Sequence, residues 1–497
     1  MPAKPTPRPG PVALVTLLLA LLWSGVPSAP IRAEEPAPSA PARSLDPALQ
    51  RALDTLRREA AAMGGQVGVA VVDLESGERL VDHRGTELHN PASNMKIVTA
   101  WALLRERGPA HRFLTALRGR REGSRVARLV LRGDGDPSFD VRHLYDMAAS
   151  LRRAGIREVG DVVVDQSAFD GVHVPPGFAA QPGEWAAFRA PVAAVSLAHN
   201  TILVEVRPGQ AGSPASVSVV PPSFVAIEGR VTTSEADRPE KVELALSASG
   251  DRLRAVLGGS IPEDAPRMEI RRRVDDPTLL AGHALADVLR ELQIAVTGKV
   301  LAGRAERAAP VLAEHASEPL ALLVHGMGKY SNNFYAEMLF KSLSAGPGRV
   351  AAFDASVRRL EAMLDEAGVA RRGAVFHNGS GLFDGGVISP LTLAELLREA
   401  HRDPRVSPEL TAQLSVAGVD GTLRHRLTRW RASRSVRGKT GTLAAVSALS
   451  GYVLRPGGGG VAFSVIANDV SGRAISMRKP IDAFVDRLAQ QTLGQAP

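Results

Sequence analysis

Three short motifs with nucleophilic, basic and anion-binding side chains occur in one order along a chain of 497 residues. They are Ser93-Asn94-Met95-Lys96, Ser331-Asn332-Asn333 and Lys439-Thr440-Gly441. Together they supply a serine nucleophile, a lysine that can accept its proton, a second hydroxyl beside an amide, and a cation for a carboxylate. This set predicts acyl transfer through a serine ester, on a peptide that ends in a free carboxylate.

The spacing of Ser93 and Lys96 places both side chains on one face of a helix, because three residues span nearly one turn. A neutral Lys96 can then accept the Ser93 proton, and the helix N-terminus offers backbone N–H groups to an oxyanion. The alternative is a surface pair without a chemical role. The chain contains such a pattern at Ser476-Met477-Arg478-Lys479, where the following Pro480 disfavours helix at the lysine.

The second motif contributes a hydroxyl and an amide. Ser331 can relay a proton to a leaving amine, and Asn333 can hold Lys96 and a substrate amide. Taken alone, the motif also fits a polar patch on an amphipathic helix. It is the one Ser-x-Asn in the sequence.

The third motif contributes a cation and hydroxyls. On an edge strand, Lys439 and the hydroxyls of Thr440 and Thr442 can bind a carboxylate, and Gly441 leaves room for substrate beside the backbone. A simple turn is the alternative for this motif alone. The three motifs together, in this order, favour a catalytic site.

Lysine usage supports a chemical role for two of these residues. The chain has eight lysines and 52 arginines, and Lys96 and Lys439 both fall inside the motifs. Arginine stays protonated in proteins, whereas a desolvated lysine can become a neutral base. A lysine in a chain that otherwise uses arginine is therefore expected where its chemistry matters.

The elements that must position the motifs can be predicted from hydrophobic periodicity and turn residues. A strand hairpin is expected at 66–73 and 79–83. A helix is expected at 94–107, with Ser93 at its start, and another at 320–341, with Ser331 near its middle. Two further strands are expected at 444–453 and 461–468, followed by a helix at 480–493. Helices and antiparallel strands at both ends of the chain predict an α+β domain that is split in sequence.

Between these halves the sequence changes to short β-type runs. We predict a split domain at 45–116 and 308–497, and an inserted, mostly β accessory region of two nested domains at 117–307. Gly133-Asp134-Gly135-Asp136-Pro137 fits a rigid turn better than a cation site, because an EF-hand needs further ligands at fixed positions.

The N-terminus predicts export. Lys4 and Arg8 precede an apolar run at 12–26, and residues 1–33 read as a cleaved signal peptide, followed by a disordered tether at 34–44. An uncleaved membrane anchor is the alternative, but the run is short for a span. The chain has no cysteine, which excludes disulfides and a lipoprotein anchor. The net charge of +8 with few aromatic residues does not indicate nucleic-acid binding.

The motifs and their spacing resemble the D-alanyl-D-alanine carboxypeptidase/endopeptidase family, the low-molecular-mass class C penicillin-binding proteins. Ser331 follows Ser93 by 238 residues, a long gap that matches a β-lactamase/transpeptidase-like domain interrupted by accessory domains. Class A β-lactamases have a far shorter gap. The resemblance covers about residues 45–490 and includes the words Pro91-Ala92-Ser93-Asn94-Met95-Lys96, Tyr335-Ala336-Glu337-Met338-Leu339, Asn378-Gly379-Ser380-Gly381-Leu382 and Lys439-Thr440-Gly441-Thr442-Leu443.

The resemblance implies a role for each motif residue. Ser93 forms the acyl-enzyme with Lys96 as base, and Ser331 and Asn333 complete proton transfer and substrate positioning. Lys439, Thr440, Gly441 and Thr442 bind the terminal carboxylate, and the N–H groups of Ser93 and Thr442 form the oxyanion hole. The implied substrates are peptidoglycan muropeptides, with β-lactam antibiotics as covalent inhibitors and no metal or organic cofactor.

Other functions use the same residues. The acyl-enzyme can pass to an amine, as in a transpeptidase, or the site can hydrolyse β-lactams. A non-catalytic cell-wall scaffold is a different class of function, against which the intact motifs argue. We expect a periplasmic protein without a membrane span after signal cleavage, because the last residues are too short and polar for an amphipathic anchor.

Overall fold

The two ends of the chain meet in one antiparallel sheet, as the computed structural model shows for residues 46–180, 183–383, 385–429 and 434–494. The predicted signal peptide and tether lie outside these described residues. The strand order is β19-β20-β21-β22-β1-β2, and β1 pairs along its whole length with β22. The strands are β1 (Gln66–Asp73), β2 (Arg79–His83), β19 (Ser415–Val416), β20 (Val436–Leu443), β21 (Val446–Leu454) and β22 (Gly460–Asn468).

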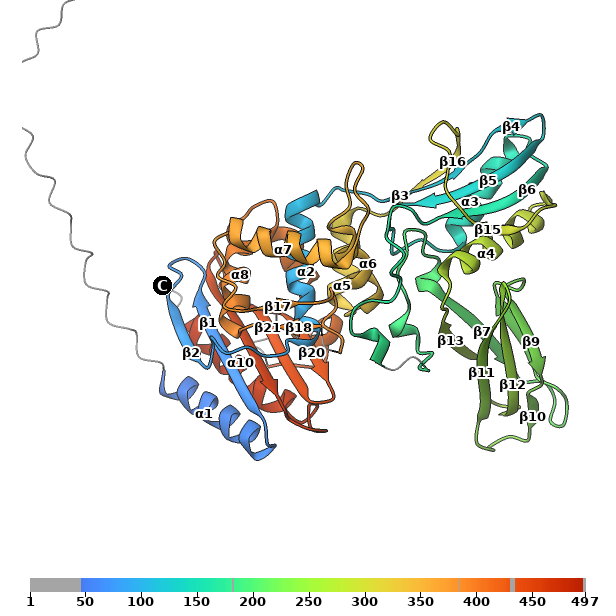
Figure 1. Ribbon diagram of the computed structural model, residues 1–497. Helices are drawn as coiled ribbons and strands as arrows, with labels where there is room; N and C mark the ends of the chain where they lie inside the picture. The colour runs from blue at the N-terminus through green and yellow to red at the C-terminus, as the bar shows by residue number, and fades with distance from the viewer. Residues whose placement is uncertain (1–45, 181–182, 384, 430–433, 495–497) are drawn as a thin grey trace, which may run out of the picture. The chain divides into compact units, whose positions relative to one another are not determined.

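Helices cover both faces of this sheet (Figure 1). Successive side chains of a strand point to opposite faces, so Val69 and Val71 pack with the terminal helices, whereas Ala70 and Val72 pack against Leu391. The first face is covered by α1 (Pro47–Ala62) and α10 (Arg478–Gly494), and the second by α8 (Pro390–Arg402). The continuous apolar strands follow from burial on both sides.

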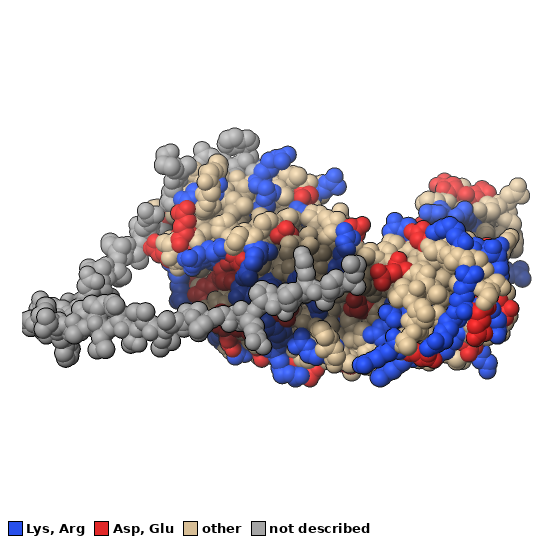
Figure 2. All heavy atoms as spheres, turned by 90° about the horizontal axis from the view of Figure 1, so that it is seen from above, with Lys and Arg blue, Asp and Glu red and all other residues tan. Residues whose placement is uncertain are grey.

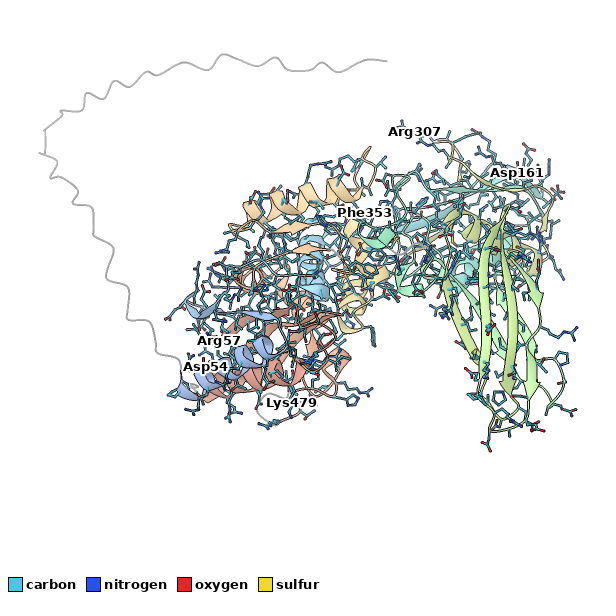
Figure 3. All side chains as sticks on the ribbon, turned by 60° about the horizontal axis from the view of Figure 1, so that its bottom comes forward. Asp54, Arg57, Asp161, Arg307, Phe353 and Lys479 are labelled. Atoms are coloured by element: carbon cyan, nitrogen blue, oxygen red, sulfur yellow. The ribbon has the colours of Figure 1, made fainter. Side chains whose placement is uncertain are left out.

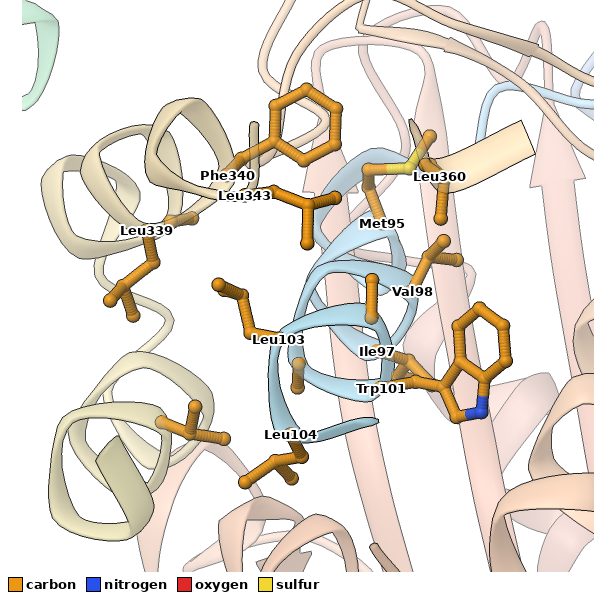
Figure 4. Close-up of a cluster of buried hydrophobic side chains, with 14 of the residues drawn as sticks. Met95, Ile97, Val98, Trp101, Leu103, Leu104, Leu339, Phe340, Leu343 and Leu360 are labelled. Carbon is orange, nitrogen blue, oxygen red and sulfur yellow. The ribbon is translucent and has the colours of Figure 1, made fainter. Parts of the chain in front are cut away.

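Helix α2 (Met95–Arg107) is the centre of the larger core. Its residues from Met95 to Leu104 are all buried, so it is enclosed rather than amphipathic. Figure 4 shows Leu103 of α2 on the side toward Leu339 of α6, and Met95 of α2 beside Leu360 of α7. The surrounding helices are α5 (Leu320–Lys329), α6 (Asn333–Ser342), α7 (Phe353–Glu366) and α9 (Ser407–Gln413).

The expected single helix at 320–341 is wrong, because α5 ends at Lys329 and α6 begins at Asn333. Ser331 adopts a positive φ of 54°, which breaks the helical path. Asn332 then caps α6, and its side-chain oxygen accepts a hydrogen bond from the backbone N–H of Tyr335 at 3.1 Å. The second motif therefore occupies a tight turn between two helices.

The inserted region contains a mixed sheet and two smaller sheets. The mixed sheet has the order β14-β6-β5-β3-β16, with β4 paired to β5 and β15 to β6. Its strands are β3 (Leu114–Arg118), β4 (Arg121–Glu122), β5 (Arg125–Gly133), β6 (Glu158–Asp165), β14 (Ala295–Val296), β15 (Val300–Ala302) and β16 (Val311–Ala316). Helices α3 (Val141–Arg153) and α4 (Pro277–Glu291) pack on it, so this part is less purely β than expected.

The smaller sheets come from the sequence between β6 and β14. They contain β7 (Thr201–Arg207), β8 (Ser216–Val220), β9 (Val225–Gly229), β10 (Thr232–Ser234), β11 (Lys241–Ser249), β12 (Arg252–Pro262) and β13 (Met268–Arg273). An all-β segment is thus nested inside an α/β segment, which itself interrupts the domain that carries the three motifs. A two-stranded sheet, β17 (Val375–Phe376) and β18 (Gly386–Val387), belongs to that domain.

Positive and negative side chains are interspersed on the face shown in Figure 2, without a continuous basic surface. Arg57 and Asp54 on α1, both labelled in Figure 3, form one of the surface ion pairs, with Arg57 Nη1 and Asp54 Oδ1 3.4 Å apart. Among the residues that the structure describes, none of the helices has the length and apolar character needed to cross a bilayer.

Candidate active site

Ser93 lies in a short 3-10 turn, η1 (Ala92–Asn94), immediately before α2. The preceding Ala92 has a positive φ of 47°, which turns the chain sharply onto the helix. The turn packs against β20 and β21, and Asn94 Nδ2 donates to Ser450 Oγ of β21 at 2.7 Å. Sheet and helix together therefore fix the position of the Ser93 hydroxyl.

Lys96 is fully buried, and three oxygen atoms surround its amine. Its Nζ lies 2.9 Å from Ser93 Oγ, 2.8 Å from Asn333 Oδ1 and 2.9 Å from Ser380 O. Ser93 and Asn333 were expected here, whereas the Ser380 carbonyl was not. A neutral amine has two hydrogens and one lone pair. Asn333 and Ser380 can take both hydrogens, which leaves the lone pair directed at the Ser93 hydroxyl.

The surroundings of Lys96 favour the neutral amine. Burial lowers the pKa of Lys96 to about 7, and the negative charge of Glu337 opposes part of that effect. Near neutral pH a large fraction of Lys96 therefore carries a lone pair. A base with a pKa near the working pH combines availability with strength.

Lys439 forms the other wall of the site. Its side chain is buried on β20, and its Nζ donates to Ser331 Oγ at 2.9 Å and to Thr440 O at 2.8 Å. Burial lowers the pKa of Lys439 well below its usual value, and the charge of Lys96 acts in the same direction. An incoming carboxylate would stabilise the protonated Lys439. All three motifs meet here.

The residues after Lys439 form an open strand edge. Strand β19 pairs with β20 at Gly438 and Arg437, and among the described residues no strand pairs with the edge of β20 beyond Lys439 on that side. Thr440 Oγ1 donates to Thr422 Oγ1 at 2.8 Å, and the exposed Thr442 Oγ1 accepts from Arg478 Nη2 at 3.3 Å. Both threonine hydroxyls thus belong to the part of β20 that follows Lys439 and lacks pairing with β19.

Gly441 is needed for a reason that the sequence did not show. A Cβ at this position would lie 2.7 Å from Pro91 O and 3.1 Å from Ala92 Cβ. The glycine therefore lets β20 approach the turn that carries Ser93, and this close contact brings the third motif beside the first.

The second copy of the Ser-x-x-Lys pattern has a different environment. Helix α10 begins at Arg478 and includes Lys479, so the expected loss of helix before Pro480 is wrong; proline is tolerated in a first helical turn. Ser476 and Lys479 are both exposed, and Figure 3 labels Lys479 on the surface. Burial, rather than helical position, distinguishes Lys96 from Lys479.

Sequence reasoning missed four contributors to the site. Glu337, Ser380, Thr422 and Arg478 each contact a motif residue or act on its charge. Glu337 follows Asn333 by one helical turn, which was a usable signal. Thr422 and Arg478 are brought in by tertiary packing alone.

A cleft of about 980 Å³ opens from the second motif. It includes Ser331 and Asn333 on one side and reaches Phe188 and Arg271 of the inserted region. Tyr330, 77% exposed, stands at its wall directly before Ser331. The site therefore continues beyond the motif residues into a space that can hold a larger ligand.

Comparisons with known proteins agree with the resemblance seen in the sequence. A model of the D-Ala-D-Ala carboxypeptidase 3 (S13) family matches residues 49–490. A D-alanyl-D-alanine carboxypeptidase of Actinomadura sp. (strain R39) is 34% identical over 468 residues, which is 90% of this chain and 86% of the relative. The carboxypeptidase DacB of Haemophilus influenzae is 26% identical over 421 residues, 82% of this chain and 86% of the relative.

Solved structures show the same fold. Penicillin-binding protein 4 of H. influenzae matches with a TM-score of 0.74 and 25% identity, over 87% of this chain and 98% of that one. A structure of the same protein complexed with a novel β-lactam matches with a TM-score of 0.69 at 25% identity, with the same coverage. The predicted family and the predicted α+β, transpeptidase-like fold are confirmed.

The basicity of Lys96 predicts a pH dependence. Acylation of Ser93 by benzylpenicillin should rise about tenfold per pH unit below the pKa and level off above it, because only neutral Lys96 accepts the proton. The midpoint should lie near the Lys96 pKa of about 7. The measurement is the second-order acylation rate constant across this range. A rate that does not change with pH, or that falls as pH rises toward neutrality, would contradict this assignment.

Proposed function

The chain belongs to the D-Ala-D-Ala carboxypeptidase 3 (S13) family, and we propose that it is a serine D-Ala-D-Ala carboxypeptidase acting through an acyl-enzyme on Ser93. One observation carries the proposal: the buried amine of Lys96 lies 2.9 Å from Ser93 Oγ and is held from two other sides by fixed acceptors. That geometry suits a neutral base aimed at a serine hydroxyl.

Acylation follows from this geometry. Lys96 Nζ accepts the proton of Ser93 as Oγ forms a bond to the carbonyl carbon of the penultimate D-Ala. The negative charge moves to the carbonyl oxygen, for which the N–H groups of Ser93 and Thr442 are the proposed donors. The η1 turn, which carries Ser93, and strand β20, which carries Thr442, approach each other at Gly441, so the two proposed donors belong to neighbouring segments.

The leaving group is bound and protonated on the Lys439 side. The terminal carboxylate of the substrate binds Lys439 with the hydroxyls of Thr440 and Thr442. Ser331 Oγ, 2.9 Å from Lys439 Nζ, passes a proton to the leaving amine as the peptide C–N bond breaks. Free D-Ala departs, Ser331 is reprotonated by the proton that Lys96 took from Ser93, and Lys96 returns to its neutral form.

Water completes the cycle by attacking the ester on Ser93: Lys96 accepts a proton from the water, the bond between the acyl carbon and Ser93 Oγ breaks, and the proton returns to Ser93 Oγ. A β-lactam carries an acyl carbon and a carboxylate in a similar arrangement, so it would acylate Ser93 and be released slowly. The complex of the H. influenzae penicillin-binding protein 4 with a β-lactam supports this part of the proposal. No step requires a metal or an organic cofactor.

We further propose endopeptidase activity on cross-linked muropeptides. Ser331 protonates the leaving amine, so the leaving chain must extend from Ser331, where the cleft of about 980 Å³ begins. A single D-Ala fills only a small part of that volume. Tyr330 and Arg271 at its walls offer an aromatic face and a cation to a second peptide strand.

The proposed place of action is the periplasm or another space outside the cytoplasm. Residues 1–33 carry the features of a signal peptide, and the substrate occurs in the cell wall. The proposed partners are therefore peptidoglycan muropeptides.

Substitution of the nucleophile tests the acyl-enzyme. Ser93→Ala should abolish both the covalent benzylpenicillin adduct and the release of D-Ala, with a loss of activity of at least about a thousandfold. Mass spectrometry of the intact mature protein and a D-Ala assay are the measurements. Ser476→Ala, in the exposed copy of the pattern, is the matched control and should keep the adduct. A well-folded wild-type protein without an adduct would instead favour the cell-wall scaffold.

The cleft predicts that two reactions can be separated. Tyr330→Ala and Arg271→Glu should reduce hydrolysis of cross-linked dimers by about tenfold or more, because they remove contacts to the leaving strand. Release of D-Ala from a short peptide should change by less than about twofold. Leu322→Ala, an exposed position on α5 outside the cleft, is the control. Equal losses on both substrates would rule out the cleft as the site of the second strand.

A further inference from the structure

Glu337 is a fully buried carboxylate that belongs to none of the three motifs. It lies on α6 one helical turn after Asn333, on the side of the helix that faces Lys96. Its Oε2 accepts from the backbone N–H of Gly379 at 3.1 Å, and its Oε1 accepts from that of Ser380 at 2.9 Å. A buried carboxylate held by backbone donors beside a reactive lysine calls for an explanation.

Glu337 fixes the loop that supplies a ligand to Lys96. The N–H of Ser380 is held by Glu337, while the carbonyl of the same residue accepts from Lys96 Nζ at 2.9 Å. The loop is also held by α2, where Thr99 Oγ1 donates to Gly379 O at 2.8 Å. A Cβ at Gly379 would lie 2.5 Å from Ala336 O, so the loop packs directly against α6.

Glu337 also sets the charge balance of the site. Its negative charge opposes the lowering of the Lys96 pKa by burial, and Lys439 is the second buried amine of the site. Burial raises the pKa of Glu337, while its hydrogen bonds and Lys96 lower it. Both carboxylate oxygens accept backbone N–H groups, which suits the ionised form because a carboxylic acid would need an acceptor for its own proton.

We infer that Glu337 is a positioning residue for the general base: it anchors the loop that orients Lys96 and supplies the buried negative charge that stabilises the ammonium formed when Ser93 loses its proton. The inference rests on the proposed function. In the acylation step the Ser93 O–H bond breaks and a new N–H bond forms on Lys96. The resulting cation then lies between Asn333 Oδ1, Ser380 O and the charge of Glu337, rather than in an apolar interior.

Glu337→Gln should therefore change the acylation reaction in two ways. Without the negative charge, protonated Lys96 is less stable, so the midpoint of the pH profile for benzylpenicillin acylation should move to lower pH by about one unit or more. Lys96 also becomes a weaker base, so the plateau rate should fall. At a pH below the wild-type midpoint, the variant should retain a larger fraction of its own plateau than the wild-type protein does.

Two control variants separate charge from loop position. Thr99→Val removes a different hydrogen bond to the loop, the one to Gly379 O, without a change of charge, and should lower the plateau with an unmoved midpoint. Glu399→Gln removes a carboxylate that contacts Trp101 and Arg105 on the same helix α2, away from Lys96, and should leave the profile unchanged. Only Glu337→Gln should move the midpoint.

The outcomes distinguish this inference from the proposed function. If Glu337→Gln has a reduced plateau at the wild-type midpoint, Glu337 is only structural and the inference is overturned. If the wild-type protein is not acylated at all, the proposed function itself fails. Should Glu337→Gln not fold, Glu337→Asp keeps the charge; a wild-type midpoint with a lower plateau supports the inference, and a midpoint shifted as far as one unit overturns it.

Discussion

The structure depends on keeping one amine dry and fully hydrogen-bonded. Lys96 is buried beneath the turn that carries Ser93, and its Nζ is within 2.9 Å of three oxygen atoms. An exposed lysine at neutral pH is charged and has no free lone pair. Burial of the amine without hydrogen-bond acceptors would destabilise the folded protein, because each unsatisfied polar group in an interior lowers the free energy of unfolding. The site keeps the Lys96 amine both buried and hydrogen-bonded, because its acceptors come from segments that are far apart in the sequence.

Most of the catalytic domain can be understood from this constraint. Helix α2 is buried from Met95 to Leu104, which shields Lys96 from water, and the partly exposed Ser93 lies directly before this rigid element. Helix α6 brings Asn333 and Glu337 to the same amine, one turn apart. The sheet joins the two ends of the chain through β1 and β22, and so places Lys439 opposite α2. The inserted region leaves these contacts intact and extends the site through the cleft beside Ser331.

The sequence predicted the parts of this arrangement that depend on local patterns. The hairpin at β1 and β2, the helix after Ser93 and the strands near the C-terminus follow periodicity closely. The motifs gave the residues that meet in the site, with Lys96 beside Ser93 and Asn333, and Lys439 beside Ser331, since their residue types define their chemistry. The break at Ser331 was missed, although an Asn before a helical run is a known cap signal. Ser380 O and Thr422 could not be predicted, because a backbone carbonyl has no sequence signature and Thr422 is placed by tertiary packing. Burial itself, which distinguishes Lys96 from Lys479, is a property of the fold.

The most direct test is the ionisation of Lys96 in the free protein. With only eight lysines in the chain, the protein labelled with ¹³C at lysine Cε gives few resonances, and Lys96→Arg identifies the one of interest. The account predicts that this resonance titrates near the Lys96 pKa of about 7. A Lys96 resonance that stays in the charged position until the pH approaches the ordinary lysine value of about 10.4 would contradict the neutral-base mechanism.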